Sequence, residues 1–239
     1  ILQAVGLFIV PFLVYKLVNR EDVKYPVFGS NQVLLFVGLF GLIMFCAYPV
    51  INAMAEWNQS LHLPDAFKGI DDWMRAKEAE AEALIEQFLV MNSVGDLLFN
   101  LLVIAILPAI GEELFFRGMM QSLFHKWFKN AHLAVWIVAI FFSAFHLQFL
   151  GFVPRMVLGA VLGYAAVYSG SLIVPIAGHF VNNGLAVILT YIYGVETMSS
   201  GSEVLGSSAN DWIYVSLSAL VLIGGMFLMK RMSERKQPT

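Results

Sequence analysis

The sequence predicts an all-α, polytopic transmembrane helical bundle with about seven membrane-spanning segments and one amphipathic helix outside the cytoplasm. Three observations lead to this fold class. Of the 239 residues, 59% are hydrophobic and only 13% are charged, more apolar than a soluble domain of this length needs. The apolar residues form long runs without any charge, namely Tyr25–Ala55, Asn130–Pro154, Met156–Val195 and Trp212–Met229. The single cysteine, Cys46, lies in such a run and can form no disulfide within the chain.

Seven segments follow these apolar runs. We expect them at about Ile1–Val18, Asn31–Ala55, Asn92–Phe128, Ala131–Gln148 and Val153–Tyr168, then from after Ser171 to Tyr193, and at Trp212–Met229. Because proline lacks an N–H and crowds the preceding turn, Pro11 and Pro108 are expected to bend the first and third segments. The chain begins without methionine inside an apolar stretch, so we also expect one more segment upstream.

The acidic stretch Glu56–Val90 differs from its neighbours. It carries eight acidic residues against three basic ones, and we expect it to be helical from Asp71 onward. Its apolar residues recur at the three- and four-residue spacing of one helix face: Ile70, Trp73, Met74, Ala81, Leu84, Ile85 and Phe88. We interpret this stretch as a surface helix that lies on the membrane or on the other helices. The alternative is a specific acidic binding site.

The distribution of lysine and arginine predicts the orientation, because cytoplasmic loops are enriched in both. Nine of the fourteen fall in the loop after the first segment, near the turn at Lys129 and in the C-terminal tail: Lys16, Arg20, Lys24, Lys126, Lys129, Lys230, Arg231, Arg235 and Lys236. With these places in the cytoplasm, the acidic stretch and the loop Glu196–Asp211 fall outside. The sequence therefore predicts an integral membrane protein with a cytoplasmic C-terminus.

The chain is organised around the stretch Ile110–Arg117. Two adjacent carboxylates, Glu112 and Glu113, and the guanidinium of Arg117 interrupt a run that otherwise reads as membrane-buried. A charge at the bilayer centre costs roughly 2.5–3.5 kcal/mol even on lenient insertion scales, so the three must face protein or a water-filled cavity. In a helix, Glu113 and Arg117 lie one turn apart and can form a supporting pair. Glu112 is rotated about 100° away and stays free to act.

A histidine in the next segment falls at the height of Glu112. Glu112 lies seventeen residues before Lys129, and His146 lies sixteen residues after Asn130. If the two segments form a hairpin about this turn, antiparallel helices bring the two side chains to nearly the same height. Phe142, one turn before His146, could shield or orient the imidazole.

The sixth segment adds His179 and Asn183, which are one turn apart and present an imidazole and a carboxamide side by side. Either intramembrane histidine alone would be read as a helix-to-helix hydrogen bond. Polar groups in hydrocarbon cluster with one another, however, so the sequence predicts one shared polar site.

Such a site could hydrolyse a peptide bond. Glu112 would take a proton from water, and His146 would orient that water. His179 and Asn183 would donate hydrogen bonds to the oxyanion of the tetrahedral intermediate, and a dry setting strengthens these bonds.

The motifs Glu112-Glu113-x-x-x-Arg117, Phe142-x-x-x-His146 and His179-x-x-x-Asn183 resemble the signature of the CPBP (Abi) family of intramembrane proteases. That family includes the type II CAAX prenyl proteases and bacterial relatives linked to bacteriocin processing or self-immunity. The resemblance covers about Leu101–Ile192. It implies a helical membrane fold with the site in a cavity among the helices, Glu112 as catalytic glutamate with His146, and His179 with Asn183 as the oxyanion pair.

We expect a bacterial inner membrane as the location, and we divide the chain into three parts. Residues 1–100 hold the first transmembrane helices and the acidic amphipathic helix. Residues 101–193 form the catalytic core. Residues 194–239 comprise a polar loop, the last transmembrane helix and the basic tail.

The role of metal stays open at this point, because the family has been described both as metalloproteases and as metal-independent glutamate proteases. We expect no cofactor, with zinc or another divalent metal as the alternative. Its ligands would then be Glu112, His146 and His179, a permitted set for zinc. The His-Glu-x-x-His helix of other membrane metalloproteases is absent from the sequence.

Two other functions compete with the protease. A proton-coupled transporter could use Glu112, His146 and His179 as a relay, and a non-catalytic immunity or scaffold protein could keep the polar site for stability alone. For the protease we expect a membrane-associated polypeptide substrate in the lipid bilayer and no nucleic acid. The sequence identifies neither the cleavage site nor a prenyl pocket.

Overall fold

The computed structural model of the chain describes residues 32–199 and 211–235. The regular elements in these two ranges are helices throughout, which confirms the predicted all-α class. They are α2 (Val33–Cys46), α3 (Tyr48–Ser60), η2 (Asp65–Phe67), α4 (Lys68–Leu89), α5 (Val94–Asn100), η3 (Leu101–Ile106), α6 (Leu107–Glu113), η4 (Leu114–Gln121), α7 (Ser122–Phe128), α8 (Ala131–Ala144), η5 (Phe149–Gly151), α9 (Phe152–Ser169), α10 (Ile173–Tyr193), α11 (Val195–Ser199) and α12 (Trp212–Glu234). The predicted first segment, Ile1–Val18, lies outside the described residues.

Four helical stretches are long and apolar enough to cross a membrane: Val94–Phe128, Phe149–Ser169, Ile173–Tyr193 and Trp212–Glu234. The bent pair α2–α3 makes a fifth if it is counted as one span. The sequence predicted six in this part of the chain, and α8 accounts for the difference. It has 14 residues, about 21 Å of helix, against a hydrocarbon core of roughly 30 Å. The predicted end at Gln148 is wrong, because Leu147 has a left-handed φ of 54° that an α-helix does not contain.

The predicted second segment is two helices, α2 and α3, which meet at an angle of 46°. Pro49 at the start of α3 lacks the N–H that would continue the ladder of hydrogen bonds. The hydroxyl of Ser218 in α12 enters the break: it accepts from the Val50 N–H at 3.2 Å and donates to the Cys46 carbonyl at 2.6 Å. A side chain inserted in this way fixes the bend. Helix α12 therefore sets the angle at which α3 leaves α2.

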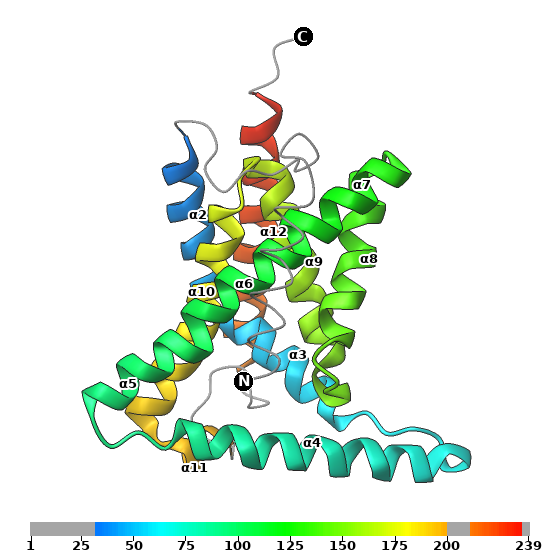
Figure 1. Cartoon of the computed structure of the whole chain (residues 1–239), viewed down its shortest axis with the longest axis vertical. Coiled ribbons are helices and arrows are strands. Elements are labelled where there is room, and N and C mark those ends of the chain that lie inside the picture. The colour runs from blue at the N-terminus through cyan, green and yellow to red at the C-terminus, as the bar shows by residue number, and fades with distance from the viewer. Residues whose placement is uncertain (1–31, 200–210, 236–239) are drawn as a thin grey trace.

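The predicted third segment is one continuous helical stretch, Val94–Phe128, which runs diagonally across the molecule in Figure 1. Pro108 lies inside it and does not end it. Two π-helical stretches, Leu101–Ile106 and Leu114–Gln121, flank α6. Such wide turns are rare and are frequently found at functional sites. Here they bracket the turn that carries both glutamates.

The largest hydrophobic cluster lies between α2, α9, α10 and α12. Phe36 and Phe40 of α2, Leu162 of α9 and Met229 of α12 are fully buried in it. Helices α2 and α10 approach closely because Gly178 has no side chain, and a Cβ there would overlap the ring of Phe40. These four helices form the rigid part of the bundle behind the polar site.

Helix α4 lies across one end of the bundle, nearly perpendicular to the spans (Figure 1). It is amphipathic as predicted, but its apolar face points outward: Ile70, Trp73, Leu84, Ile85 and Phe88 are 44–61% exposed. Its buried residues are instead two carboxylates, Asp71 and Glu78. In the described residues α4 therefore lies against the other helices through its acidic side, and its apolar side faces the surroundings.

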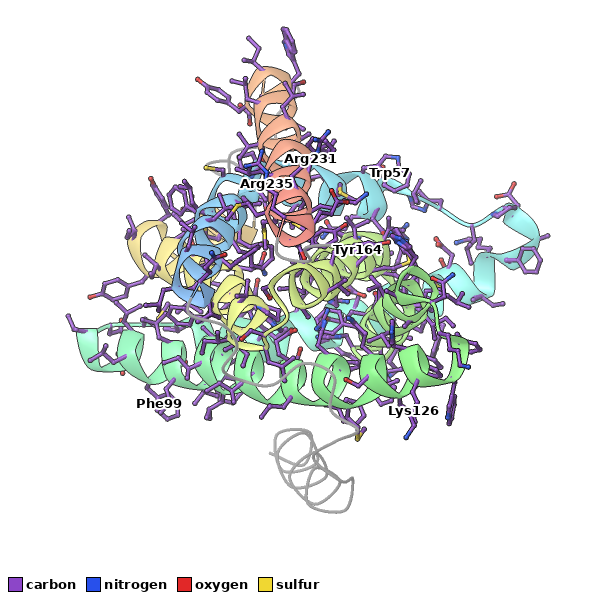
Figure 2. The ribbon with its side chains drawn as sticks, turned by 90° about the horizontal axis from the view of Figure 1, so that it is seen from above. Trp57, Phe99, Lys126, Tyr164, Arg231 and Arg235 are labelled. Atoms are coloured by element: carbon purple, nitrogen blue, oxygen red, sulfur yellow. The ribbon has the colours of Figure 1, made fainter. Side chains whose placement is uncertain are left out.

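The two ends of the bundle differ in charge. The α7–α8 turn and the end of α12 lie at one end, and α4 and α11 lie at the other (Figure 1). Figure 2, seen from above, shows the first end with Lys126, Arg231 and Arg235. The basic α7–α8 turn and end of α12 thus lie opposite the acidic α4, as the sequence predicted. The predicted basic loop Lys16–Lys24, Lys236 and most of the acidic loop Glu196–Asp211 lie outside the described residues, and a cytoplasmic C-terminus stays a prediction.

Candidate active site

The two glutamates end α6 and are enclosed by protein. Glu113 is completely buried, and Glu112 is 8% exposed. Arg117, in the π-helical stretch that follows, is also completely buried. Three buried ionisable groups require partners, since an unpaired buried charge is costly.

The expected pair forms. Nη1 of Arg117 donates to Oε1 of Glu113 at 2.6 Å, and Nη2 donates to the Gly159 carbonyl of α9 at 2.8 Å. The guanidinium also stacks over the ring of Phe142, 4.6 Å from its centroid. Arg117 therefore ties together α6, α8 and α9.

A second contact of the same kind lies one turn further on. Nε2 of Gln121 donates to the Gly163 carbonyl at 3.1 Å. Gly159 and Gly163 make this approach possible: a Cβ at Gly159 would lie 3.1 Å from Cδ1 of Phe142, and one at Gly163 would lie 2.8 Å from Oε1 of Gln121. Small residues four apart allow such contacts between membrane helices.

His179 of α10 bridges the two glutamates. Its Nδ1 lies 2.8 Å from Oε1 of Glu113. Because that oxygen belongs to a carboxylate paired with Arg117, Nδ1 is the protonated nitrogen. Nε2 then faces Oε2 of Glu112 at 3.9 Å, as an acceptor if the ring is neutral and as a donor if it is imidazolium.

His146 approaches Glu112 from the other side. It follows the end of α8, where its Nδ1 donates to the Phe142 carbonyl at 2.7 Å. Its Nε2 lies 3.9 Å from Oε2 of Glu112, so the hairpin brings the two residues to the same height. The ring of Phe142 contacts both imidazoles edge-on, with centroid distances of 5.1 Å to His146 and 5.9 Å to His179.

Three groups thus converge on one point. Oε2 of Glu112 is buried without a hydrogen-bond partner, and the Nε2 atoms of both histidines face it. A separation of 3.9 Å is too long for a direct hydrogen bond and is compatible with one water between the groups. The side chain of His146 is 29% exposed, which makes it the most accessible member of the cluster.

The cluster as placed does not fit a tetrahedral metal. Ligands about 2.0–2.1 Å from zinc stand roughly 3.3 Å apart in a tetrahedral site, and both nitrogen–oxygen separations here are 3.9 Å. Across residues 32–199 and 211–235, no group of three His, Cys, Asp or Glu side chains is arranged to hold a metal ion. We therefore derive no step through a metal.

Asn183 makes its hydrogen bonds away from Glu112. Its Nδ2 donates to the Ile104 carbonyl at 3.1 Å, and its Oδ1 accepts from Asn182 at 3.1 Å. Ile104 is the residue whose carbonyl an α-helix would pair with the N–H of residue 108, and Pro108 has no N–H to give. Asn183 therefore supports the backbone of the π-helical turn before α6, a contact that the sequence alone did not indicate.

Sequence reasoning also missed the residues that hold the connection between α8 and α9. Arg155 donates to the carbonyl and to the side chain of Gln148, at 3.3 and 2.9 Å. Asn58 of α3 and Glu78 of α4 contact the same connection. The sequence offered one signal: Arg155 is the single charged residue between the apolar runs that end at Pro154 and begin at Met156.

Fold and site together define a class: an integral membrane protein of apolar helices that encloses a glutamate–histidine cluster. Residues 94–185 match the family described as type II CAAX prenyl endopeptidase Rce1-like, which confirms the resemblance to CAAX-type proteases of the CPBP family. This match supports a CAAX-type intramembrane protease in general.

Two curated proteins are similar to part of the chain. The uncharacterized protein YpbD of Bacillus subtilis (strain 168) is 27% identical over 86 residues, which cover 34% of this chain and 41% of that protein. An uncharacterized 24.3 kDa protein of Escherichia coli is 28% identical over 109 residues, 44% of this chain and 50% of that protein. The chain thus spans half or less of the length of these relatives. No solved structure matches.

Proposed function

We propose that the chain is an intramembrane endopeptidase that hydrolyses a peptide bond of a membrane-associated polypeptide with a glutamate-activated water. One observation carries the proposal: the Nε2 atoms of His146 and His179 each lie 3.9 Å from the unpartnered Oε2 of Glu112. The interior between these atoms is where the reacting water would be held.

The hydrogen bonds around the cluster indicate how the reacting water would be bound in the first step, the attack on the peptide carbonyl. Because Nδ1 of His146 donates to a backbone carbonyl, its Nε2 can accept from water. A water between the two side chains donates one hydrogen to Glu112 and the other to His146, which leaves an oxygen lone pair for the carbonyl carbon. As the C–O bond forms, Glu112 takes the water proton.

His179 would serve the oxyanion as an imidazolium, since only then does its Nε2 carry a hydrogen. Glu113 accepts from the opposite nitrogen and would stabilise that charge. One hydrogen of the Asn183 amide is engaged with Ile104, and its second would be the other donor. Collapse of the tetrahedral intermediate then breaks the C–N bond, and Glu112 returns its proton to the leaving nitrogen.

The experiment compares Glu112→Gln with the wild type, because glutamine keeps the shape and removes the base. Peptides released from host membranes identify a substrate, and the purified protein in lipid nanodiscs is then assayed on it. We expect Glu112→Gln to abolish cleavage while thermal unfolding is unchanged. Glu80→Gln, an exposed carboxylate of α4, is the matched control and should cleave normally.

Thorough chelation separates the mechanisms. Cleavage that persists after chelation and is absent in Glu112→Gln supports the glutamate–water reaction. Loss on chelation with recovery on added zinc would replace it by a metal reaction. Full activity of Glu112→Gln would overturn both, and an unchanged set of membrane peptides would favour a scaffold or transporter.

A further inference from the structure

The reactive histidine of the proposed function stands on a short connection. His146 is the second residue after α8 ends at Ala144, and the chain then passes through Leu147 at a φ of 54° into η5. A leucine rarely adopts this left-handed conformation. A connection of this kind keeps one shape only if its surroundings hold it.

Asn58 holds this connection from α3. Its Oδ1 accepts from the backbone N–H of Val153 at 2.8 Å, and its Nδ2 donates to the Phe149 carbonyl at 3.5 Å. The first bond is the strong one by geometry. One amide therefore joins the first residue of η5 to the first turn of α9, and Asn58 is 5% exposed.

Helix α4 adds a second contact. Oε2 of Glu78 accepts from the Leu150 N–H at 3.3 Å, and the ring of Trp73 lies 5.5 Å from that of Phe149. Glu78 is 8% exposed, so its carboxylate binds within the protein and is not a solvated surface group.

We propose that Asn58 is a positioning residue that holds the His146 connection in its reactive geometry, with Glu78 as its second support. Both residues precede residues 94–185, which match the family, so α3 and α4 complete a site whose chemistry lies elsewhere in the chain. The proposal rests on the proposed function only for its effect on rate. The placement of the His146 ring can be tested without activity.

Asn58 also stabilises the fold, and this role has to be distinguished from the positioning of His146. Val153 lies in the first turn of α9, so Asn58 also satisfies one of the free N–H groups at that helix start, and its loss would destabilise the fold in any case. Asn100 offers a matched control. It is also buried, 3% exposed, and its Nδ2 donates to the Phe88 carbonyl of α4 at 2.6 Å, yet it does not contact the His146 connection.

The experiment compares Asn58→Leu with Asn100→Leu in the full chain in nanodiscs, below the unfolding temperature of both. The ring signals of His146 in ¹⁵N-histidine-labelled protein, identified with His146→Gln, should shift and broaden in Asn58→Leu and stay unchanged in Asn100→Leu. Cleavage should fall by about 10²-fold in kcat, the cost of misplacing a reacting group by about 1 Å, with KM little changed. Asn58→Asp keeps the acceptor for Val153 and should restore most of the rate.

Glu78→Leu should move the same histidine signals if Asn58→Leu does not fold. The proposal is overturned if the His146 signals in the Asn58 and Asn100 variants are alike, or if activity falls only as each variant loses stability. A wild type without cleavage, but with a displaced His146 ring in Asn58→Leu, would count against the proposed function and leave the positioning role standing.

Discussion

Oε1 of Glu113 is shared by two cationic or polar partners, Nδ1 of His179 at 2.8 Å and Nη1 of Arg117 at 2.6 Å. The guanidinium of one helix and the imidazole of another thus meet at a single carboxylate oxygen. A change to the arginine can therefore reach the histidine through that oxygen, and also through the Phe142 ring that contacts both side chains. The buried pair is therefore part of the site and also part of the fold.

We predict that Arg117→Leu lowers both stability and activity. Glu113 would remain buried without its cation, which typically costs about 3–5 kcal/mol of unfolding free energy, and the Gly159 carbonyl would lose its donor. Thermal unfolding in detergent measures the change. Lys77→Leu removes an exposed pair, Lys77–Glu80, of the kind worth about 0–1 kcal/mol. Equal stability of the two variants would show that the buried pair contributes nothing.

We predict opposite outcomes for two glycines of α10. A Cβ at Gly178 would overlap the ring of Phe40, so Gly178→Ala must push α2 away, and overpacking of this kind typically costs about 1–3 kcal/mol. At Gly184 the nearest atom to such a Cβ is 3.7 Å away, and alanine favours helix by up to about 1 kcal/mol over glycine. Unfolding temperatures of the two variants check this, and similar values would refute the close α2–α10 packing.

We predict that the start of α4 loosens in acid. Arg75, and to a smaller extent His62 and the Leu63 N–H, hold the pKa of the Asp71 carboxyl down at about 2, against 3.8 for a free one. A lowered pKa means that the stabilisation is complete above 3.8 and is lost as the pH falls through 2. The protection of the α4 amides against hydrogen exchange, relative to the intrinsic rate at each pH, should fall over that interval. Asp71→Asn should exchange faster already at neutral pH, with little further change in acid.

The sequence predicted well those features that depend on near neighbours. Glu113 and Arg117 are four residues apart, and helical geometry alone brings them together. The matched distances of Glu112 and His146 from the Lys129 turn worked because one hairpin decides their heights. Both predictions require only the geometry of a single helix and the position of one turn.

Features that depend on distant parts of the chain were missed. The break at Pro49 depends on a hydroxyl in α12, and the sequence offered no link between Ser218 and that turn. Pro108 lies inside the continuous stretch Val94–Phe128, where Asn183 donates to the Ile104 carbonyl, and the sequence offered no link between Asn183 and that turn. The outward apolar face of α4 accompanies two buried carboxylates: Glu78 accepts from the Leu150 N–H, and Asp71 accepts from Arg75 of the same helix, His62 and the Leu63 N–H. Composition predicts neither set of partners.

The continuous stretch Val94–Phe128 has 35 residues, about 52 Å of helix, and is longer than a hydrocarbon core of roughly 30 Å is thick. Such hydrophobic mismatch is relieved by tilting or by deforming the surrounding lipid, and full relief by tilt alone needs about 55°, far above the usual 20° or so. Glu112 is the nineteenth residue counted from Val94, at the midpoint of the helix. A change in bilayer thickness therefore swings the two ends of the helix through the headgroups, whereas the carboxylate stays close to the pivot and keeps its depth.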